Sequence, residues 1–267
     1  MILAMYLLLA DETNQQPSRN AKFYVYGGVF FPIDSLVELH VQIDKIRCVA
    51  GYGPADKFKF DTRSRPSHVS FEASTAAKRK TLDICKSLKC KFIVQVILHD
   101  IIKNQGIEQQ SYWAADYVFG RFNTFLKVEA KDFGICVIDN LPTKNQYKYL
   151  SKKFATGLTL HTGTTVSLSN IKLFGTSCIG ASHACSAMDI VLGSFRYCIN
   201  NPENEDAAKN MMGKVMDLLW HTRENQKIKV LEKGLIVRPK ITQIRSLEHK
   251  QKYQELFDHI NYLIEDY

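Results

Sequence analysis

Apolar residues along this chain fall into two patterns, continuous runs and helically spaced stripes. Continuous runs predict strands covered on both faces, because such strands have no solvent side on which polar residues would alternate. The runs lie at residues 2–10, 22–31, 91–100 and 132–140, and a further strand is predicted at residues 170–178. The turn-forming stretch TNQQPSRN separates the first two runs, so we expect these strands to form an antiparallel hairpin.

The helical stripes lie at residues 34–47, 74–88, 111–130, 145–158, 182–199 and 205–220. Strands that alternate with helices indicate an α/β fold, and the N-terminal hairpin makes its sheet mixed rather than fully parallel. We expect this domain to span residues 1–222, with residues 223–267 appended to it. Within the appended part, residues 227–240 could form a β-hairpin or an extended arm around Gly234.

A last amphipathic helix is predicted near the C-terminus. Its apolar stripe comprises Tyr253, Leu256, Phe257, Ile260, Leu263, Ile264 and Tyr267. A stripe of this kind predicts docking on the chain's own domain, and the alternative is a homodimer formed through this helix.

The opening run MILAMYLLLADETN raises the question of export or membrane insertion. No Lys or Arg precedes the apolar residues and no small-residue cleavage pattern follows them, which argues against a secretory signal. The run is also shorter than the ~20 residues that a membrane span needs. We therefore expect a buried strand and no membrane partner.

Cysteine usage and net charge bear on the cellular location and the partners that we expect for this protein. Seven cysteines without a CxxC pair indicate neither a disulfide framework nor a common zinc site, and a reducing cytoplasm is the expected location. Cys178, His183 and Cys185 match no familiar zinc spacing, so we interpret them as core residues. The formal charge of +8 fits either a polyanionic partner such as nucleic acid or solubility alone.

Acidic residues stand where two of the predicted strands end and inside one predicted helix. Asp11 and Glu12 follow the first apolar run, Asp139 follows the fourth, and Asp189 lies among apolar residues in SAMDIVLG. Strand-end acids are also common turn formers, and a buried Asp189 could simply pair with Arg196 or hydrogen-bond a serine.

Taken together, Asp11, Asp139 and Asp189 suggest a metal site. Two carboxylates ~4 Å apart repel by about 4 kcal/mol at an effective dielectric constant of ~20. A divalent cation turns that repulsion into binding, and carboxylate oxygens suit Mg²⁺ or Mn²⁺. Two such ions can align water and a leaving oxygen for phosphodiester hydrolysis.

A basic stretch, DKFKFDTRSRP, could supply the substrate contacts. Lys57, Lys59, Arg63 and Arg65 are candidates to hold phosphates, and Phe58 or Phe60 could stack on a base. The alternative is an ordinary strand edge or solvated loop. The sequence contains neither a Walker loop nor a GxSxG elbow.

These motifs resemble the domain of unknown function 3800 family. The similar segments are ADET with its Asp-Glu pair, YVYGGVFF, KFKF, VIDN, SAMD and GLIVRPK, which together span roughly residues 5–240. The family pattern on the late helix is QxxD, so Asp189 matches while Ser186 replaces the usual Gln. The resemblance implies a ribonuclease-H-like fold with Asp11, Asp139 and Asp189 as metal ligands and with Glu12 and Lys59 nearby.

The main hypothesis is therefore a Mg²⁺- or Mn²⁺-dependent nuclease. Lys59 would neutralise the scissile phosphate or orient a carboxylate, while Glu12 would complete the catalytic group. Two alternatives remain: a non-catalytic module that binds nucleic acid or protein, and a phosphatase or nucleotidase that acts on small phosphates.

Overall fold

The computed structural model describes residues 5–13, 17, 21–139, 145–159, 163–177, 182–201, 204–224 and 227–264. Six strands form one sheet in the order β10-β3-β2-β1-β4-β7. Their bounds are β1 (Tyr6–Thr13), β2 (Phe23–Pro32), β3 (Lys91–Leu98), β4 (Gly134–Asp139), β7 (Ile171–Ser177) and β10 (Leu235–Val237). Strand β2 is antiparallel to β1 and β3, whereas β4, β7 and β10 pair in parallel with β1, β4 and β3, respectively. The predicted α/β fold with a mixed sheet is confirmed.

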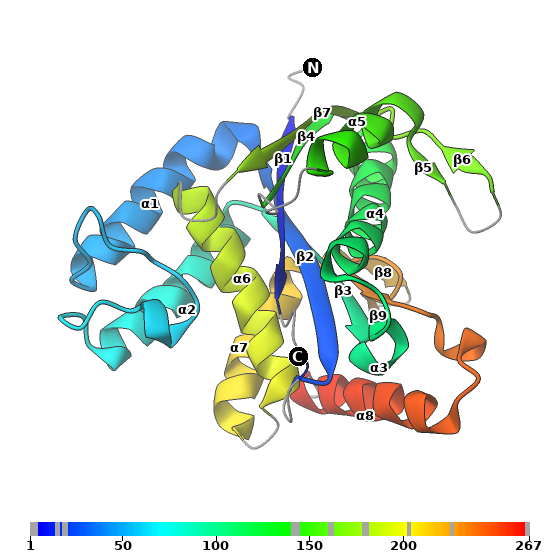
Figure 1. Ribbon diagram of the computed structural model, residues 1–267. Helices are drawn as coiled ribbons and strands as arrows, with labels where there is room; N and C mark the ends of the chain where they lie inside the picture. The colour runs from blue at the N-terminus through cyan, green and yellow to red at the C-terminus, as the bar shows by residue number, and fades with distance from the viewer. Residues whose placement is uncertain are drawn as a thin grey trace.

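Helices cover both faces of this sheet (Figure 1). The helices are α1 (Leu36–Val49), α2 (Phe71–Ser87), α3 (His99–Ile102), α4 (Ile107–Phe125), α5 (Gln146–Thr156), α6 (His183–Asn200), α7 (Glu205–Leu218) and α8 (Leu247–Leu263). Helices α1, α2 and α6 lie on one side of the strands and α4 and α5 on the other (Figure 1). We call these sides the α6 face and the α4 face.

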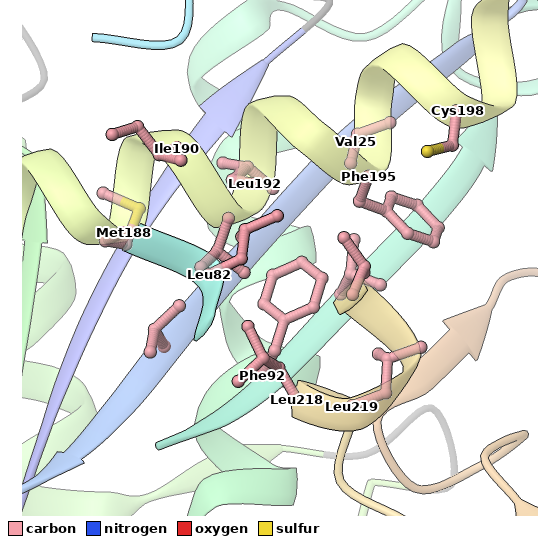
Figure 2. Packing of buried hydrophobic residues seen from close by; sticks show 14 of the residues in the cluster. Val25, Leu82, Phe92, Met188, Ile190, Leu192, Phe195, Cys198, Leu218 and Leu219 are labelled. Atoms are coloured by element: carbon pink, nitrogen blue, oxygen red, sulfur yellow. The ribbon is translucent and has the colours of Figure 1, made fainter. Parts of the chain in front are cut away.

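Each face has its own hydrophobic core. On β1, Leu9 packs in the core of the α6 face, whereas Leu8 and Ala10 pack in the core of the α4 face. Figure 2 shows the first of these cores, where Phe195 and Leu192 of α6 pack near Phe92. Burial of one such side chain stabilises the fold by roughly 1.5–3 kcal/mol. Because both faces are covered at the centre of the sheet, β2 and β3 are buried along almost their whole length.

The C-terminal part joins the main sheet instead of forming a separate arm. Strand β9 (Lys227–Lys229) pairs with β8 (Thr222–Glu224), and the chain then enters the sheet as β10 beside β3. Just before β10 the chain crosses the backbone of Trp220 at Gly234. This position needs glycine, because a Cβ there would lie 2.6 Å from the Trp220 backbone nitrogen. The short hairpin of β5 (Leu158–Thr159) and β6 (Thr165–Val166) was not predicted either.

Helix α8 docks on its own domain, as predicted. Tyr253, Leu256, Ile260 and Leu263 are buried in the core of the α6 face, and Tyr267 lies outside the described residues. The Tyr253 hydroxyl donates to the Arg238 carbonyl at 2.8 Å. Most of the stripe that the alternative, a homodimer through this helix, would use is therefore already buried within the chain. No helix in the described ranges is long and apolar enough to cross a bilayer.

Candidate functional site

Asp11 and Asp139 extend from neighbouring parallel strands toward the same face of the sheet. Strand β1 runs on to Thr13, so Asp11 lies inside the strand instead of beyond it. Side chains alternate along a strand, which puts Asp11 on the α6 face with Leu9. The β1–β4 register ends at Ala10 opposite Ile138, so the next residue on β4 is Asp139. The two aspartates therefore occupy the same level of the sheet at the carboxyl ends of their strands.

Helix α6 brings the third aspartate, Asp189, to the carboxyl ends of β1 and β4. Gly27 lies opposite Asp11 on β2, and a Cβ there would come within 2.9 Å of the Leu192 side chain on α6. On the outer side of the helix, a Cβ at Gly193 would lie 2.4 Å from the Phe60 Cβ. The two glycines let α6 lie closely between the sheet and the basic stretch, where it carries Asp189.

The basic stretch itself holds Asp189. The backbone N–H of Phe60 donates to Asp189 Oδ2 at 2.7 Å, and Lys78 Nζ donates to the Phe60 carbonyl at 2.8 Å. Asp189 is therefore fixed by a main-chain amide, not by the serine or the Arg196 ion pair considered from the sequence. Ser186 stands where the domain of unknown function 3800 family, which the motifs resemble, usually has Gln. It is buried in α6, one turn before Asp189.

These elements enclose a pocket of about 210 Å³. Its charged lining residues are Asp11, Glu12, Lys59, Asp61, Asp189 and Arg196. Asp139 lies beside this pocket, in a hollow of about 10 Å³ between the ends of β4 and β7 and helix α6. The structure thus brings four of the five predicted catalytic residues to one cavity and places Asp139 next to it.

The carboxylates of this pocket repel one another. Burial raises the pKa of Asp11 well above its usual range, and the charges of Glu12, Asp139 and Asp189 raise it further. Burial also raises the pKa of Asp189, an effect opposed by the Phe60 N–H and by nearby Lys59 and Arg196. Among the described residues, no Lys or Arg forms an ion pair with Asp11 or Asp189.

Carboxylate oxygens at this spot have the right chemistry for Mg²⁺ or Mn²⁺. The coordination shell is not assembled, however: no three His, Cys, Asp or Glu side chains in the described ranges are grouped closely enough to hold a metal ion. Asp11, Asp139 and Asp189 therefore fit a cation by donor type and by mutual repulsion, and their side chains would have to move closer together to bind it.

Of the four predicted phosphate ligands, only Lys59 lines the pocket. Lys57 is exposed outside it. Arg63 is exposed and forms an ion pair with Asp61 at 2.9 Å. Arg65 donates to the backbone carbonyl of Val69 and so has a structural contact.

Sequence reasoning missed a second basic residue of the pocket, Arg196. It follows Asp189 by seven residues on one helix, a spacing that places both on one side, yet we considered it only as an ion-pair partner. Its guanidinium lies 6.0 Å from the centroid of the Phe60 ring, and the Lys78 ammonium lies 5.4 Å from the same ring. Phe60 is half-buried, whereas Phe58 is buried in the core and cannot stack on a ligand.

Comparison with known proteins adds no relative, since no family model and no curated protein matches this chain.

Proposed function

We propose that the pocket at the carboxyl ends of β1 and β4 binds Mg²⁺ or Mn²⁺ and hydrolyses phosphodiester bonds in nucleic acid. One observation carries this proposal. Burial of the Asp11 carboxyl on a central strand, together with the charges of acids from its own strand, from β4 and from α6, raises its pKa well above the usual range. A cluster of like charges that costs stability is typical of functional sites.

Each residue has a distinct role in this proposal. Asp11, Asp139 and Asp189 would hold the cation, which would lower the pKa of water and offset charge on the phosphate. Because the pKa of Asp11 is raised, cation binding at pH values below that pKa would release a proton from it. Glu12 would keep the local field negative, and Lys59 with Arg196, which line the same pocket, would bind the phosphate.

The ribonuclease-H-like resemblance supports the same assignment. It implies an antiparallel hairpin followed by parallel strands, and β1, β2, β4 and β7 have this arrangement. Two implied acids lie on β1 and β4 and the third on the helix that follows β7. The domain of unknown function 3800 family remains a proposal of kinship that rests on these motifs.

The decisive experiment separates metal binding from cleavage. Calorimetry with Mn²⁺ should detect binding to the wild-type protein and lose it in Asp11→Asn. Labelled single and double strands of DNA and RNA should be cut only with Mg²⁺ or Mn²⁺, and not by Asp189→Asn. Cleavage that persists in purified Asp189→Asn protein would refute the role of that carboxylate.

Lys59→Ala and Lys57→Ala form a matched pair for the substrate contact. Only the first residue lines the pocket, so we expect Lys59→Ala to weaken strand binding about tenfold, the effect of losing ~1.4 kcal/mol. Lys57→Ala should bind like the wild type in the same fluorescence-anisotropy titration.

The unassembled coordination shell favours a second candidate, a module that binds nucleic acid without cutting it. In that case strands would still bind through Lys59 and Arg196, while Mn²⁺ would give no Asp11-dependent heat. Small phosphates as the preferred substrates in the cleavage screen would instead indicate a nucleotidase.

A further inference from the structure

A larger cavity lies on the α4 face, with the sheet between it and the acidic pocket. Its volume is about 680 Å³, and it is bounded by α4, β5 and the chain that follows β10. Figure 1 shows α4 and β5 on the same side of the strands. Its main side chains are Trp113, Tyr117, Arg121, Arg238, Lys240 and Gln243. None of these residues belongs to the proposed nuclease site, so the cavity needs its own explanation.

Aromatic rings form one part of the wall. Trp113 and Tyr117 lie on one side of α4, with ring centroids 5.7 Å apart in an edge-to-face arrangement. The Arg238 guanidinium lies 4.8 Å from the centroid of the Tyr117 ring. Gly120, one turn further along α4, also lines the cavity. A Cβ there would lie 3.0 Å from the Leu158 side chain, so the absence of a side chain at this position keeps the cavity open between α4 and β5.

Basic groups outnumber acidic ones around this cavity. Arg121 and Arg238 share the carboxylate of Glu232, and the Arg238 bonds measure 2.5 and 2.8 Å. Asp116, which also lies on α4 and lines the cavity, is neutralised by Lys153 of α5 at 2.7 Å.

Lys240 is exposed at the rim, where its charge helps to lower the pKa of Glu232 without forming an ion pair with any described residue. Both carboxylates are thus already bound by cations, and the excess positive charge favours an anionic ligand.

We propose that this cavity binds a nucleoside phosphate unit. The base would pack against Trp113 and Tyr117, and the phosphate would meet Arg121 and Lys240. Stacking of a base on an aromatic ring is tolerant of base identity, and guanidinium groups match phosphate geometry. The cavity volume lies within the ~300–1,000 Å³ usual for small-molecule sites. The unit can come from a free nucleotide or from a single strand that lies across the cavity.

Intrinsic fluorescence provides a direct test, because the chain has only two tryptophans. Trp220 is 2 % exposed in the core of the α4 face, so quenching by adenosine 5′-monophosphate would come from Trp113. We expect saturable quenching, with inorganic phosphate and adenosine each binding at least about tenfold more weakly than the nucleotide.

Two variants and one control sharpen the test. Lys240→Glu changes an exposed rim residue and should weaken binding at least about tenfold in calorimetry, because it reverses a charge beside the phosphate. Trp113→Ala should abolish it, while Lys59→Ala in the acidic pocket should leave it unchanged. A hexadeoxyadenylate that binds tighter than the monophosphate would identify the strand as the source, and equal affinity would identify the free nucleotide.

The proposal is overturned if the monophosphate shows no binding at about 1 mM, a concentration that detects even millimolar affinities. It is also overturned if phosphate alone binds as well as the nucleotide, or if Lys240→Glu and Trp113→Ala bind like the wild type. Loss of binding in Lys59→Ala would move the nucleotide to the acidic pocket and likewise refute the assignment.

Discussion

The two pockets contain carboxylates under opposite electrostatic conditions. On the α6 face, burial raises the pKa of Asp11, and the charges of Glu12, Asp139 and Asp189 raise it further. On the α4 face, hydrogen bonds and charge from Arg238, with further charge from Arg121, lower the pKa of Glu232. The sheet therefore separates a site with excess negative charge from one whose lining carboxylate Asp116 and neighbouring Glu232 are both paired with cations.

The comparison assigns the two carboxylates different roles: Glu232 stabilises the fold, whereas Asp11 is available to a ligand. The Glu232 network is complete within the chain, since it ties β10 and α4 through Arg238 and Arg121. The acids around Asp11 destabilise the folded chain until a cation or a proton arrives. Mutations in the two regions should therefore change stability in opposite directions.

The largest effect is expected on the α4 face. Glu232→Gln leaves the guanidinium groups of Arg121 and Arg238 next to each other without their shared counter-charge. We expect a loss of about 2–3 kcal/mol in the free energy of unfolding, less than the 3–5 kcal/mol of a fully buried pair because Glu232 is about a third exposed. Urea denaturation monitored by circular dichroism measures this change.

Glu248→Gln is the matched control for that variant. Glu248 forms an exposed ion pair with Lys252 one helical turn away, so the midpoint of urea denaturation should not shift measurably. Equal midpoints for the two variants would show that the Glu232 network is no more important than a surface pair.

A smaller loss is expected where α6 meets the basic stretch. Gly193→Ala places a Cβ 2.4 Å from the base of the Phe60 side chain, so the backbone there must move. The clash costs about 1–3 kcal/mol, partly offset by the ~1 kcal/mol that Ala gains over Gly in a helix. We therefore expect a net loss of about 1–2 kcal/mol in urea denaturation, together with weaker Mn²⁺ binding, because Asp189 loses the Phe60 N–H.

Gly175→Ala on β7 provides the comparison for Gly193→Ala. A Cβ there would meet Val137 at an ordinary 3.7 Å, so stability and Mn²⁺ binding should stay close to wild type. Unchanged Mn²⁺ binding in Gly193→Ala would show that the position of Asp189 does not depend on this close approach.

The central strands β2 and β3 could be predicted from the sequence because they are covered on both faces and keep long apolar runs, whereas the edge strand β7 is largely exposed. The β1–β2 hairpin was predicted from the turn residues between the two runs, and its register confirms it. Strand β10 could not be assigned, because three residues that enter the sheet beside β3 carry no periodicity of their own. Its place depends on tertiary contacts such as the crossing at Gly234.

The candidate site was predictable only in part, for a similar reason. Asp11 and Asp139 follow from their place at the carboxyl ends of parallel strands, a position the pattern of apolar runs already indicates. The roles of the basic residues could not be predicted in this way, because nothing in the sequence distinguishes Lys59 from Lys57, Arg63 and Arg65. Only the fold shows that Lys59 lines the pocket while Arg63 and Arg65 are held by Asp61 and by Val69.

The smallest effect, and the one with opposite sign, is expected at Asp11. Asp11→Asn removes a charge that its neighbours oppose, so the variant should be more stable than wild type near neutral pH without divalent cations. The gain measures how strongly burial and the neighbouring charges disfavour the ionised carboxylate in the folded protein. Added Mn²⁺ should raise the melting temperature of the wild type by mass action and leave the variant unchanged.

The pH dependence of this gain follows from the raised pKa of Asp11. The folded protein keeps the Asp11 proton at pH values where the unfolded chain has lost it, so wild-type stability falls as pH rises above ~4 through the raised pKa. The gain of Asp11→Asn should therefore vanish near pH 4 and be complete above that pKa.

A lowered pKa predicts the opposite pH dependence. Asp61 lies in the same pocket but is paired with Arg63, and the pKa of its carboxyl is lowered. Asp61→Asn should consequently lower the melting temperature at neutral pH, and this loss should shrink as the pH falls. A shift of the same sign in both variants would mean that the neighbours of Asp11 do not oppose its charge.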